Sequence, residues 1–288
     1  MAASRLIDPV RGRVASAYTA GPRLDDVIAV CKSLATYGVT SAIGYWGDPD
    51  ESARAVADVH LAAINRLSAE QMDCYVSIKL SRLGFDAGLF AELASAATRS
   101  NVRLHVDALG PESVDATLRL LEGVPRTGRL GTTLPGRWHR SVDDTARIIE
   151  LGLAVRVVKG QWLDDGPKRI DPSEGFLGIV DRLSGHQGGV AVATHDVRLL
   201  TESLRHLTES GTPCESELFF GLPFRGPAIA AWRLGVPVRV YVAYGASGPP
   251  FSVKELRRKP VAWWWFMQDV LLGKDKMWRS VRRARPQL

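Results

Sequence analysis

The stretch Val155-Arg156-Val157-Val158-Lys159-Gly160-Gln161-Trp162 decides how the fold of this chain is interpreted. Its apolar, β-branched residues predict a buried strand, yet the strand carries an arginine and ends in a lysine and a glycine. An interior strand excludes such cations unless an anionic group meets them. The stretch is therefore predicted to be a buried strand that leads into a binding site.

Seven other short apolar runs resemble this one, and each of the eight is followed by a segment with helical signals. They lie at 39–46, 74–81, 102–109, 129–135, 154–160, 189–195, 214–221 and 236–244. Eight strand–helix units of roughly 30 to 35 residues suit one (β/α)₈ barrel, so the sequence predicts this α/β fold. An open doubly wound sheet, which shows a similar alternation, is the structural alternative.

Helices are expected where apolar residues recur at intervals of three and four. Such patterns run from Glu51 to Leu67 and from 196 to 209, and Pro111 opens another helix. Ser141 precedes two acidic residues and an apolar run, so it is expected to cap a helix at its N-terminus.

The predicted barrel leaves room for short additions at both ends. Residues 1–35 are expected to form an N-terminal extension with a helix, residues 36–273 the barrel, and residues 274–288 a basic tail.

Composition indicates a soluble globular protein. Hydrophobic residues make up 45% of the 288 residues and charged residues 24%, which suffices for a large core. The sequence contains neither a long apolar stretch nor a secretory leader, so a cytoplasmic location is expected. Cys31, Cys74 and Cys214 match no metal or redox spacing and are predicted to be reduced core residues.

The net charge of +6 is concentrated at the end of the chain, where six Lys and Arg residues lie between Lys274 and Arg285. The tail is predicted to be solvated. Weak peripheral contact with acidic lipid headgroups at the inner membrane face is the alternative. The remaining sequence lacks a recognised nucleic-acid module, so a small molecule is the expected partner.

In such a barrel, the active site lies at the carboxyl ends of the strands. The chain places titratable side chains there on most strands: Lys79, Asp107, Arg156, Lys159, His195, Asp196, Glu217 and Tyr241. Each has an ordinary structural explanation. Lys79 and Asp107 could form an internal ion pair, and the backbone could satisfy His195. Taken together, so many costly buried charges favour a functional site for a polar ligand.

The cations favour an anionic or electron-accepting ligand. Gly160 permits close approach of a ligand to the backbone, and free N–H groups after Thr194-His195-Asp196 could bind phosphate. A Rossmann glycine fingerprint is absent, and no set of side chains has a spacing that requires a metal.

Six motifs, in order and at family spacing between about Thr36 and Leu272, resemble the strands of proline dehydrogenases. They are Ser77-Ile78-Lys79-Leu80-Ser81, His105-Val106-Asp107-Ala108, Val155 to Gly160, Ala193-Thr194-His195-Asp196, Glu215 to Gly221 and Arg239 to Gly245. Arg258-Lys259-Pro260 and the run from Trp263 to Leu271 extend the likeness.

The resemblance implies a distorted (β/α)₈ barrel that binds FAD and moves a hydride from the carbon beside an amine nitrogen to flavin N5, giving an imine. A quinone or similar acceptor then takes the electrons. The resemblance makes Arg156, Asp107 and Lys79 the catalytic residues, and it makes Tyr241 an aromatic wall of the substrate pocket. It gives cofactor contacts to Arg156, Ala108, Pro135, Val158, Lys159, Gly160, Trp162, Thr194, His195 and Glu217.

The sequence departs from the family pattern mainly on the substrate side. In the family, two adjacent arginines of the last helix clamp the proline carboxylate, a geometry that Lys does not reproduce. Here Lys254 and Glu255 occupy those positions, flanked by Phe251 and Arg258 as further substrate-side residues. Pro135 replaces a flavin-bonding Gln and has no side-chain donor, and Glu217 also stands in place of Gln.

Three functional hypotheses follow. The first is a flavin-dependent amine dehydrogenase that acts on proline or, more in keeping with the altered helix, on a related amine or N–N compound without a free carboxylate. The second is a family member that has lost catalysis and acts as a binding protein. The third is a barrel lyase or aldolase that forms a Schiff base on Lys159 or Lys79.

Overall fold

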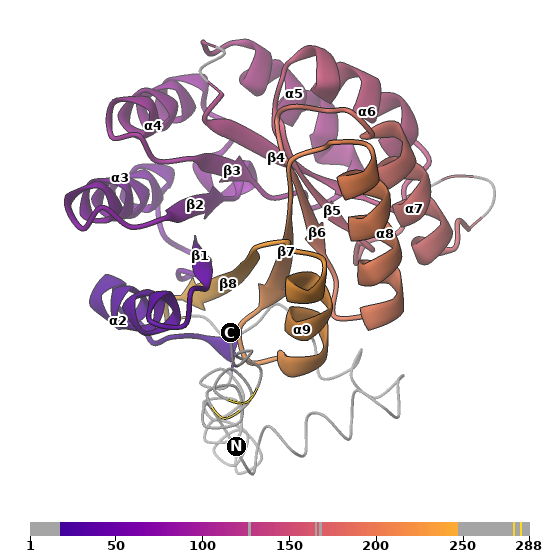
Figure 1. Cartoon of the computed structure of the whole chain (residues 1–288). Coiled ribbons are helices and arrows are strands. Elements are labelled where there is room, and N and C mark those ends of the chain that lie inside the picture. The colour runs from indigo at the N-terminus through magenta and orange to yellow at the C-terminus, as the bar shows by residue number, and fades with distance from the viewer. Residues whose placement is uncertain are drawn as a thin grey trace, which may run out of the picture.

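Eight parallel strands close into a barrel in the computed structural model of the chain (Figure 1). The structure describes residues 18–125, 128–164, 166, 169–246, Arg279 and Arg283. The strands are β1 (Thr40–Tyr45), β2 (Cys74–Ile78), β3 (Leu104–Val106), β4 (Leu130–Pro135), β5 (Ala154–Val158), β6 (Val190–Ala193), β7 (Cys214–Phe219) and β8 (Val238–Tyr244). Each lies within one of the runs predicted from the sequence.

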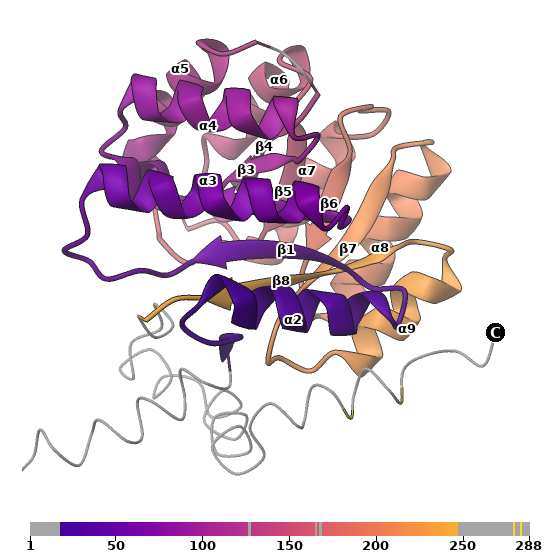
Figure 2. The same cartoon turned by 90° about the vertical axis from the view of Figure 1, so that its left-hand side faces the viewer.

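Helices follow the strands and surround the barrel, as Figures 1 and 2 show. They are α2 (Leu24–Ala35), α3 (Ala53–Ala69), α4 (Ala87–Arg99), α5 (Val114–Glu122), α6 (Ser141–Glu150), α7 (Pro172–Arg182), α8 (Val197–Glu209) and α9 (Arg225–Arg233), with short 3₁₀ helices η1 (Leu80–Leu83) and η2 (Pro111–Ser113).

Pairing between the first and the last strand closes the barrel. Thr40 on β1 lies opposite Arg239 on β8, and the six-residue pairing continues to Tyr45 opposite Tyr244. A doubly wound sheet would leave these two strands apart. The predicted (β/α)₈ barrel is therefore confirmed, and the open-sheet alternative is wrong.

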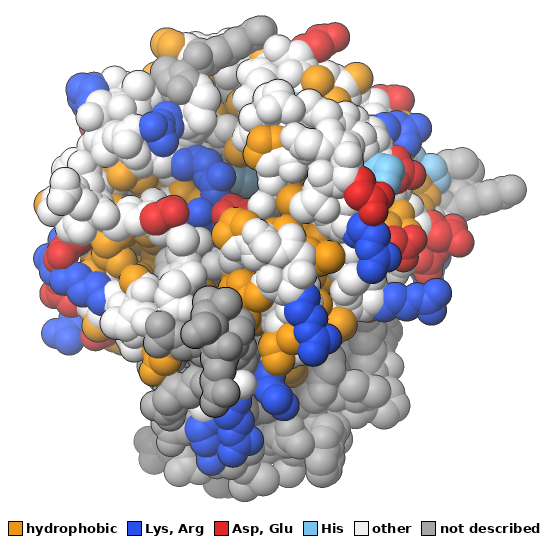
Figure 3. All heavy atoms as spheres, viewed as in Figure 1, with side chains coloured by type: hydrophobic (Ala, Val, Ile, Leu, Met, Phe, Trp, Pro, Cys, Tyr) orange, Lys and Arg blue, Asp and Glu red, His pale blue; other side chains and the backbone are white. Residues whose placement is uncertain are grey.

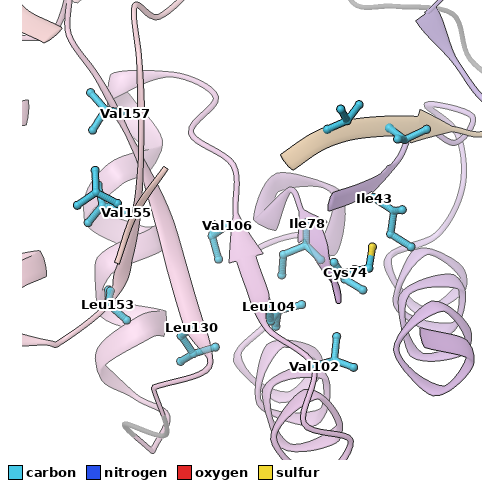
Figure 4. Packing of buried hydrophobic residues seen from close by; sticks show 14 of the residues in the cluster. Ile43, Cys74, Ile78, Val102, Leu104, Val106, Leu130, Leu153, Val155 and Val157 are labelled. Carbon is cyan, nitrogen blue, oxygen red and sulfur yellow. The ribbon is translucent and has the colours of Figure 1, made fainter. Parts of the chain in front are cut away.

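The main hydrophobic core lies between the barrel and its helices. Figure 4 shows members of this cluster on neighbouring strands, among them Ile78, Leu104 and Val155. Because successive strand residues point to opposite faces, the residues between these apolar ones point into the barrel. The inward set includes Tyr75, Arg156 and Glu217, so much of the barrel interior is polar.

The expected cap of α6 is wrong in position. Ser141 is the first residue of the helix, and Arg140 occupies the cap. The Ser141 hydroxyl donates instead to the Pro135 carbonyl oxygen, at 2.7 Å. The serine therefore ties the helix start to the end of β4, which holds that strand end in place.

The ends of the chain are only partly described. Helix α2 is present where the N-terminal extension was expected to hold a helix, and it packs against β1 and β8. The domain boundaries at 35 and 273 remain predictions, and the basic tail lies almost wholly outside the described residues. Among the described helices, none is long and apolar enough to cross a membrane. Cys31 and Cys74 are buried and Cys214 is half-buried, and all three are free thiols.

Three histidines with a lowered pKa predict that the protein loses stability in mild acid. Burial, with the nearby Lys79 charge, lowers the pKa of His60 to about 3. Burial lowers the pKa of His195 to about 4 and also lowers that of His105. The unfolded chain, with histidine pKa near 6.5, therefore binds more protons than the folded one between about pH 4 and 6.5. Stability rises with pH across this window.

We expect the free energy of unfolding to fall as pH drops from 7 to 5, by up to about 1.4 kcal/mol per pH unit for each histidine. Urea unfolding at pH 7, 6 and 5 measures this slope. The His60→Gln variant should reduce it. An equal slope in variant and wild type would refute the assignment of His60.

Candidate active site

Four charged side chains meet inside the barrel towards the carboxyl ends of the strands. Asp107 directly follows β3, Lys79 follows β2, Arg156 lies on β5 and Glu217 on β7. Inward-pointing positions of separate strands bring these distant residues together. All four were predicted site residues, and the structure places them in one network.

Arg156 is the centre of this network and is only 5% exposed. Its Nη1 lies 2.5 Å from Asp107 Oδ1, and its Nε lies 2.7 Å from Glu217 Oε1. Burial alone would lower the Arg156 pKa, but Glu217, Tyr75 and Asp107 outweigh burial and raise it well above the usual value. The guanidinium is therefore a permanent cation between two carboxylates.

Asp107 is held ionised by its neighbours. Lys79 Nζ lies 3.3 Å from Oδ2, and the Ser77 hydroxyl donates to Oδ1 at 2.6 Å. Burial would raise the Asp107 pKa, but Lys79, Arg156 and Ser77 outweigh it, and the pKa falls well below its usual range. The internal ion pair considered for Lys79 and Asp107 is thus present.

Tyr75, which precedes Ser77 on β2, is hydrogen-bonded to two members of this network. Its hydroxyl accepts a hydrogen bond from Arg156 Nη2 at 2.7 Å and donates to Glu217 Oε2. Tyr75 and Ser77 were missed in the sequence, although strict alternation from Lys79 backwards puts both on the same inward face. A buried tyrosine and serine in a strand otherwise look like ordinary core residues.

Aromatic rings form one wall beside the charges. The Tyr241 ring stacks on Phe219 with centroids 5.5 Å apart, and Phe219 stacks on Trp46 at 5.9 Å. The Tyr241 hydroxyl lies 3.4 Å from Asp107 Oδ2. A Cβ at Gly44 would overlap this hydroxyl, so the glycine makes room for the tyrosine. Tyr241 therefore presents both an apolar face and a hydroxyl to the site.

A second group of cations lies at the ends of β4 and β5. Gly160 has φ +86°, and a Cβ there would lie 2.8 Å from Pro135 Cβ and 3.1 Å from Arg137 Cγ. Arg137 Nε is buried without a hydrogen-bond partner among the described residues. Lys159 Nζ lies 3.1 Å from Asp196 Oδ2, and the Lys159 side chain is 37% exposed. Arg137, missed in the sequence because it lies in a loop, adds a donor to this group.

The turn before α8 differs from expectation. Asp196 Oδ1 accepts the N–H groups of Arg198 and Leu199, so these helical donors are not free for phosphate. His195 is satisfied by backbone on both sides: its Nδ1 lies 3.0 Å from Pro223 O, and its Nε2 accepts from Phe219 N–H at 2.9 Å. The Thr194 hydroxyl accepts from Asp196 N–H. The expectation of free donors here is wrong.

The other predicted cofactor residues are dispersed. Val158 pairs with Pro135 at the strand ends, and Ala108 and Pro135 line a small cavity of about 20 Å³ under the helices. Trp162 is 44% exposed beyond β5. The predicted substrate residues Phe251, Lys254, Glu255 and Arg258 lie outside the described residues. Within the described part, no group of three His, Cys, Asp or Glu side chains could hold a metal ion.

A closed eight-stranded barrel with ionised side chains at the carboxyl ends of its strands defines a (β/α)₈ barrel protein with a charged site. No family model matches the chain. Among curated proteins, it is 25% identical over 265 residues to proline dehydrogenase 1 of Bacillus subtilis subsp. natto, covering 84% of this chain and 86% of that one. It is 25% identical over 282 residues to proline dehydrogenase of Deinococcus radiodurans, covering 90% and 91%.

Among solved structures, the chain is similar to proline utilization A from Bdellovibrio bacteriovorus, with a TM-score of 0.72 and 16% identity. The match covers 81% of this chain and 31% of that one, so the chain spans about a third of that protein. This structural likeness supports the fold. The curated relatives, which are named proline dehydrogenase and are matched along most of their length, support the resemblance to that family of oxidoreductases.

Proposed function

We propose that the chain is an FAD-dependent dehydrogenase that oxidises the carbon beside an amine nitrogen. The observation that carries the proposal is the Arg156 cation, fixed between Asp107 and Glu217 at the carboxyl ends of the barrel strands. A fixed cation stabilises negative charge as it develops on a nearby electron acceptor. The curated relatives named proline dehydrogenase support the same reaction type.

The residues beside Gly160 fit the anionic part of FAD. The buried Arg137 Nε lacks a partner among the described residues, and the space beside Gly160 would be filled by any Cβ. Arg137 and Lys159 would hold the pyrophosphate, with Gly160 permitting close approach to the backbone. Asp196 opposes this role, because its carboxylate already pairs with Lys159.

The bound flavin would supply the hydride acceptor, and the side chains would supply position and charge. Asp107, ionised and fixed by Lys79 and Ser77, would accept a hydrogen bond from the amine N–H. The Tyr241 ring would exclude water from one side of the reacting carbon. Lys79 would hold Asp107 in the orientation that the substrate requires. The amine is thereby oriented with its α-carbon free to lose hydride.

The proposed substrate is an amine or N–N compound without a free carboxylate, rather than proline. Glu255, which stands at one of the positions given to arginine by the family resemblance, would repel a carboxylate. Lys254 would contribute one point charge in place of a bidentate fork. A quinone or similar acceptor would reoxidise the flavin, and the protein would act in the cytoplasm.

Flavin absorbance and anaerobic bleaching test this proposal. The purified protein, reconstituted with FAD, should be yellow, and pyrrolidine should bleach it at lower concentration than L-proline does. Pyrrolidine is L-proline without the carboxylate, so the pair isolates this group. A colourless protein would refute flavin binding. Yellow protein that neither amine bleaches would indicate a binding protein, and rapid bleaching by dilute L-proline would refute the substrate assignment.

A further inference from the structure

A second charged cluster lies at the other end of the barrel, where the strands begin. It contains Arg103 before β3, Arg129 before β4, Glu215 at the start of β7 and Arg239 at the start of β8. We propose that this cluster binds a small molecule through a phosphate or carboxylate group. The site is separate from the one to which FAD and amine are assigned above.

Arg239 is the arginine of the cluster that makes the most hydrogen bonds within the protein. Its side chain is 7% exposed, and its Nε donates to both carboxylate oxygens of Glu215 at 2.9 Å. Its Nη1 donates to Ser41 O at 2.6 Å, and its Nη2 to Asp73 Oδ1 at 3.1 Å. Most of its donors are thus used within the protein, so Arg239 contributes charge and rigidity.

Arg103 and Arg129 are less completely paired. Arg103 donates from Nη2 to Glu215 Oε1 at 2.9 Å and lies over the Tyr75 ring, 4.1 Å from its centroid. The Arg129 guanidinium has no hydrogen bond or ion pair with any described residue. The two guanidiniums therefore retain donors that an oxyanion could accept.

The two arginines start on adjacent strands at the same level. Leu104 on β3 lies opposite Leu130 on β4, and Leu104 N–H donates to Arg129 O at 2.8 Å. Their backbones are therefore about 4.8 Å apart, and both side chains face the same way. Two like charges so placed repel each other unless an anion lies between them. This arrangement favours an oxyanion bridging both guanidiniums.

A cavity of about 580 Å³ opens beside these side chains. Its lining includes Met72, Gln71, Asn101, Arg103 and Arg129, from the loops before β2, β3 and β4, and Arg239 at the start of β8. A second cavity of about 180 Å³ shares Tyr75 and Arg103 with it. The larger volume lies in the range of small-molecule sites, which exceeds the needs of an ion alone.

Figures 1, 2 and 3 agree with a charged cluster at the end of the barrel where the strands begin. In Figure 2 strands β1 and β8 point to the left, so the viewpoint of Figures 1 and 3 faces the end where strands begin. Figure 3 shows a central hollow on this face, with Lys and Arg side chains gathered at it.

The charge balance of the cluster also favours an anion. The cluster holds three arginines, Arg103, Arg129 and Arg239, and two carboxylates, Glu215 and Asp73, which leaves one positive charge in excess. The Asp73 side chain is 72% exposed and that of Glu215 only 14%, so water screens the Asp73 charge more. Guanidinium pairs bind phosphate and carboxylate in a bidentate manner.

Calorimetric titration at constant ionic strength tests the proposal, with phenyl phosphate and benzoate as probes. The two share a ring and differ in the anion, so they distinguish a phosphate site from a carboxylate site. At least one should bind the wild-type protein, and Arg129→Gln should weaken that binding by about tenfold or more. Arg205→Gln, on the exposed face of α8 and outside the cavity, is the matched control and should leave binding unchanged.

The variant should fold as the wild type does, because Arg129 makes no side-chain bond to described residues. Equal urea midpoints for the two proteins check this point. Absence of binding by both probes would overturn the proposal, as would equal affinity of wild type and Arg129→Gln. Retained flavin binding in the variant would separate this outcome from the assignments at the carboxyl ends of the strands.

Discussion

Replacing Arg156 by methionine is expected to destabilise the protein by about 3–5 kcal/mol at pH 7, because it leaves the buried Glu217 without its cation and the part-buried Asp107 with Lys79 alone. The Asp107 side chain is 13% exposed and the Glu217 side chain 3% exposed, so water replaces little of the lost interaction. Urea unfolding of wild type and Arg156→Met measures the difference. The variant should also bind FAD weakly.

Arg147→Met is the matched control for this prediction. Arg147 binds Glu122 with two bonds, at 2.6 and 2.7 Å, but both side chains are more than a third exposed. An exposed pair contributes about 0–1 kcal/mol, so this variant should be nearly as stable as the wild type. Equal losses in the two variants would contradict the role of burial.

The pH dependence of the Arg156→Met deficit provides a second check. Burial acts to raise the pKa of Asp107 and Arg156 is one of the groups that lower it, so the pKa of Asp107 should be higher in the variant than in the wild type. Folded-state protonation would then stabilise the variant relative to the wild type as pH falls. The difference from the wild type should therefore shrink between pH 7 and 5. A constant deficit would point to lost packing alone.

Replacing Glu217 by glutamine is expected to raise the reduction potential of the bound flavin. Glu217 lies 2.7 Å from Arg156 Nε and offsets the charge that would stabilise a reduced, anionic flavin. Removing that carboxylate charge leaves Arg156 balanced by Asp107 alone. A rise of about 30 mV corresponds to ~1.4 kcal/mol for a two-electron couple. Equilibration with a redox dye of known potential measures it.

Glu215→Gln is the corresponding control. Glu215 lies on the same strand and is part-buried with arginine partners, but at the opposite end of the barrel. Replacing Glu215 should shift the reduction potential of the flavin less than replacing Glu217 does. An unchanged or lowered potential in Glu217→Gln, or an equal shift in both variants, would contradict the proposed effect on the flavin.

The fold could be predicted from the sequence because its signals are local. Each strand is a short apolar run such as Val155 to Val158, followed by a helical pattern, and the chain length fits eight such units. The inward direction of Lys79, Asp107, Arg156 and Glu217 follows from alternation along each strand. Closure of β1 on β8 required the three-dimensional structure.

The partners of the charged residues could not be predicted in the same way. Glu217 was assigned to the cofactor, whereas the structure shows it as an ion-pair partner of Arg156. Which inward residues touch depends on the stagger of strands around the barrel, and no local pattern carries that information. For Asp196 a local signal existed, since aspartate is a preferred helix cap, and it argued against free N–H donors at α8.

Tyr75 lies between the two charged layers of this barrel. Its ring is within 6 Å of the guanidinium carbons of Arg103, Arg156 and Arg239, at 4.1, 5.7 and 5.1 Å. Many barrels fill this axis with Val, Ile and Leu. The dehydration penalty of charged groups falls as temperature rises, while apolar burial gains little more. Heating should therefore weaken the stabilising contribution of this ionic axis less than that of an axis repacked with aliphatic side chains.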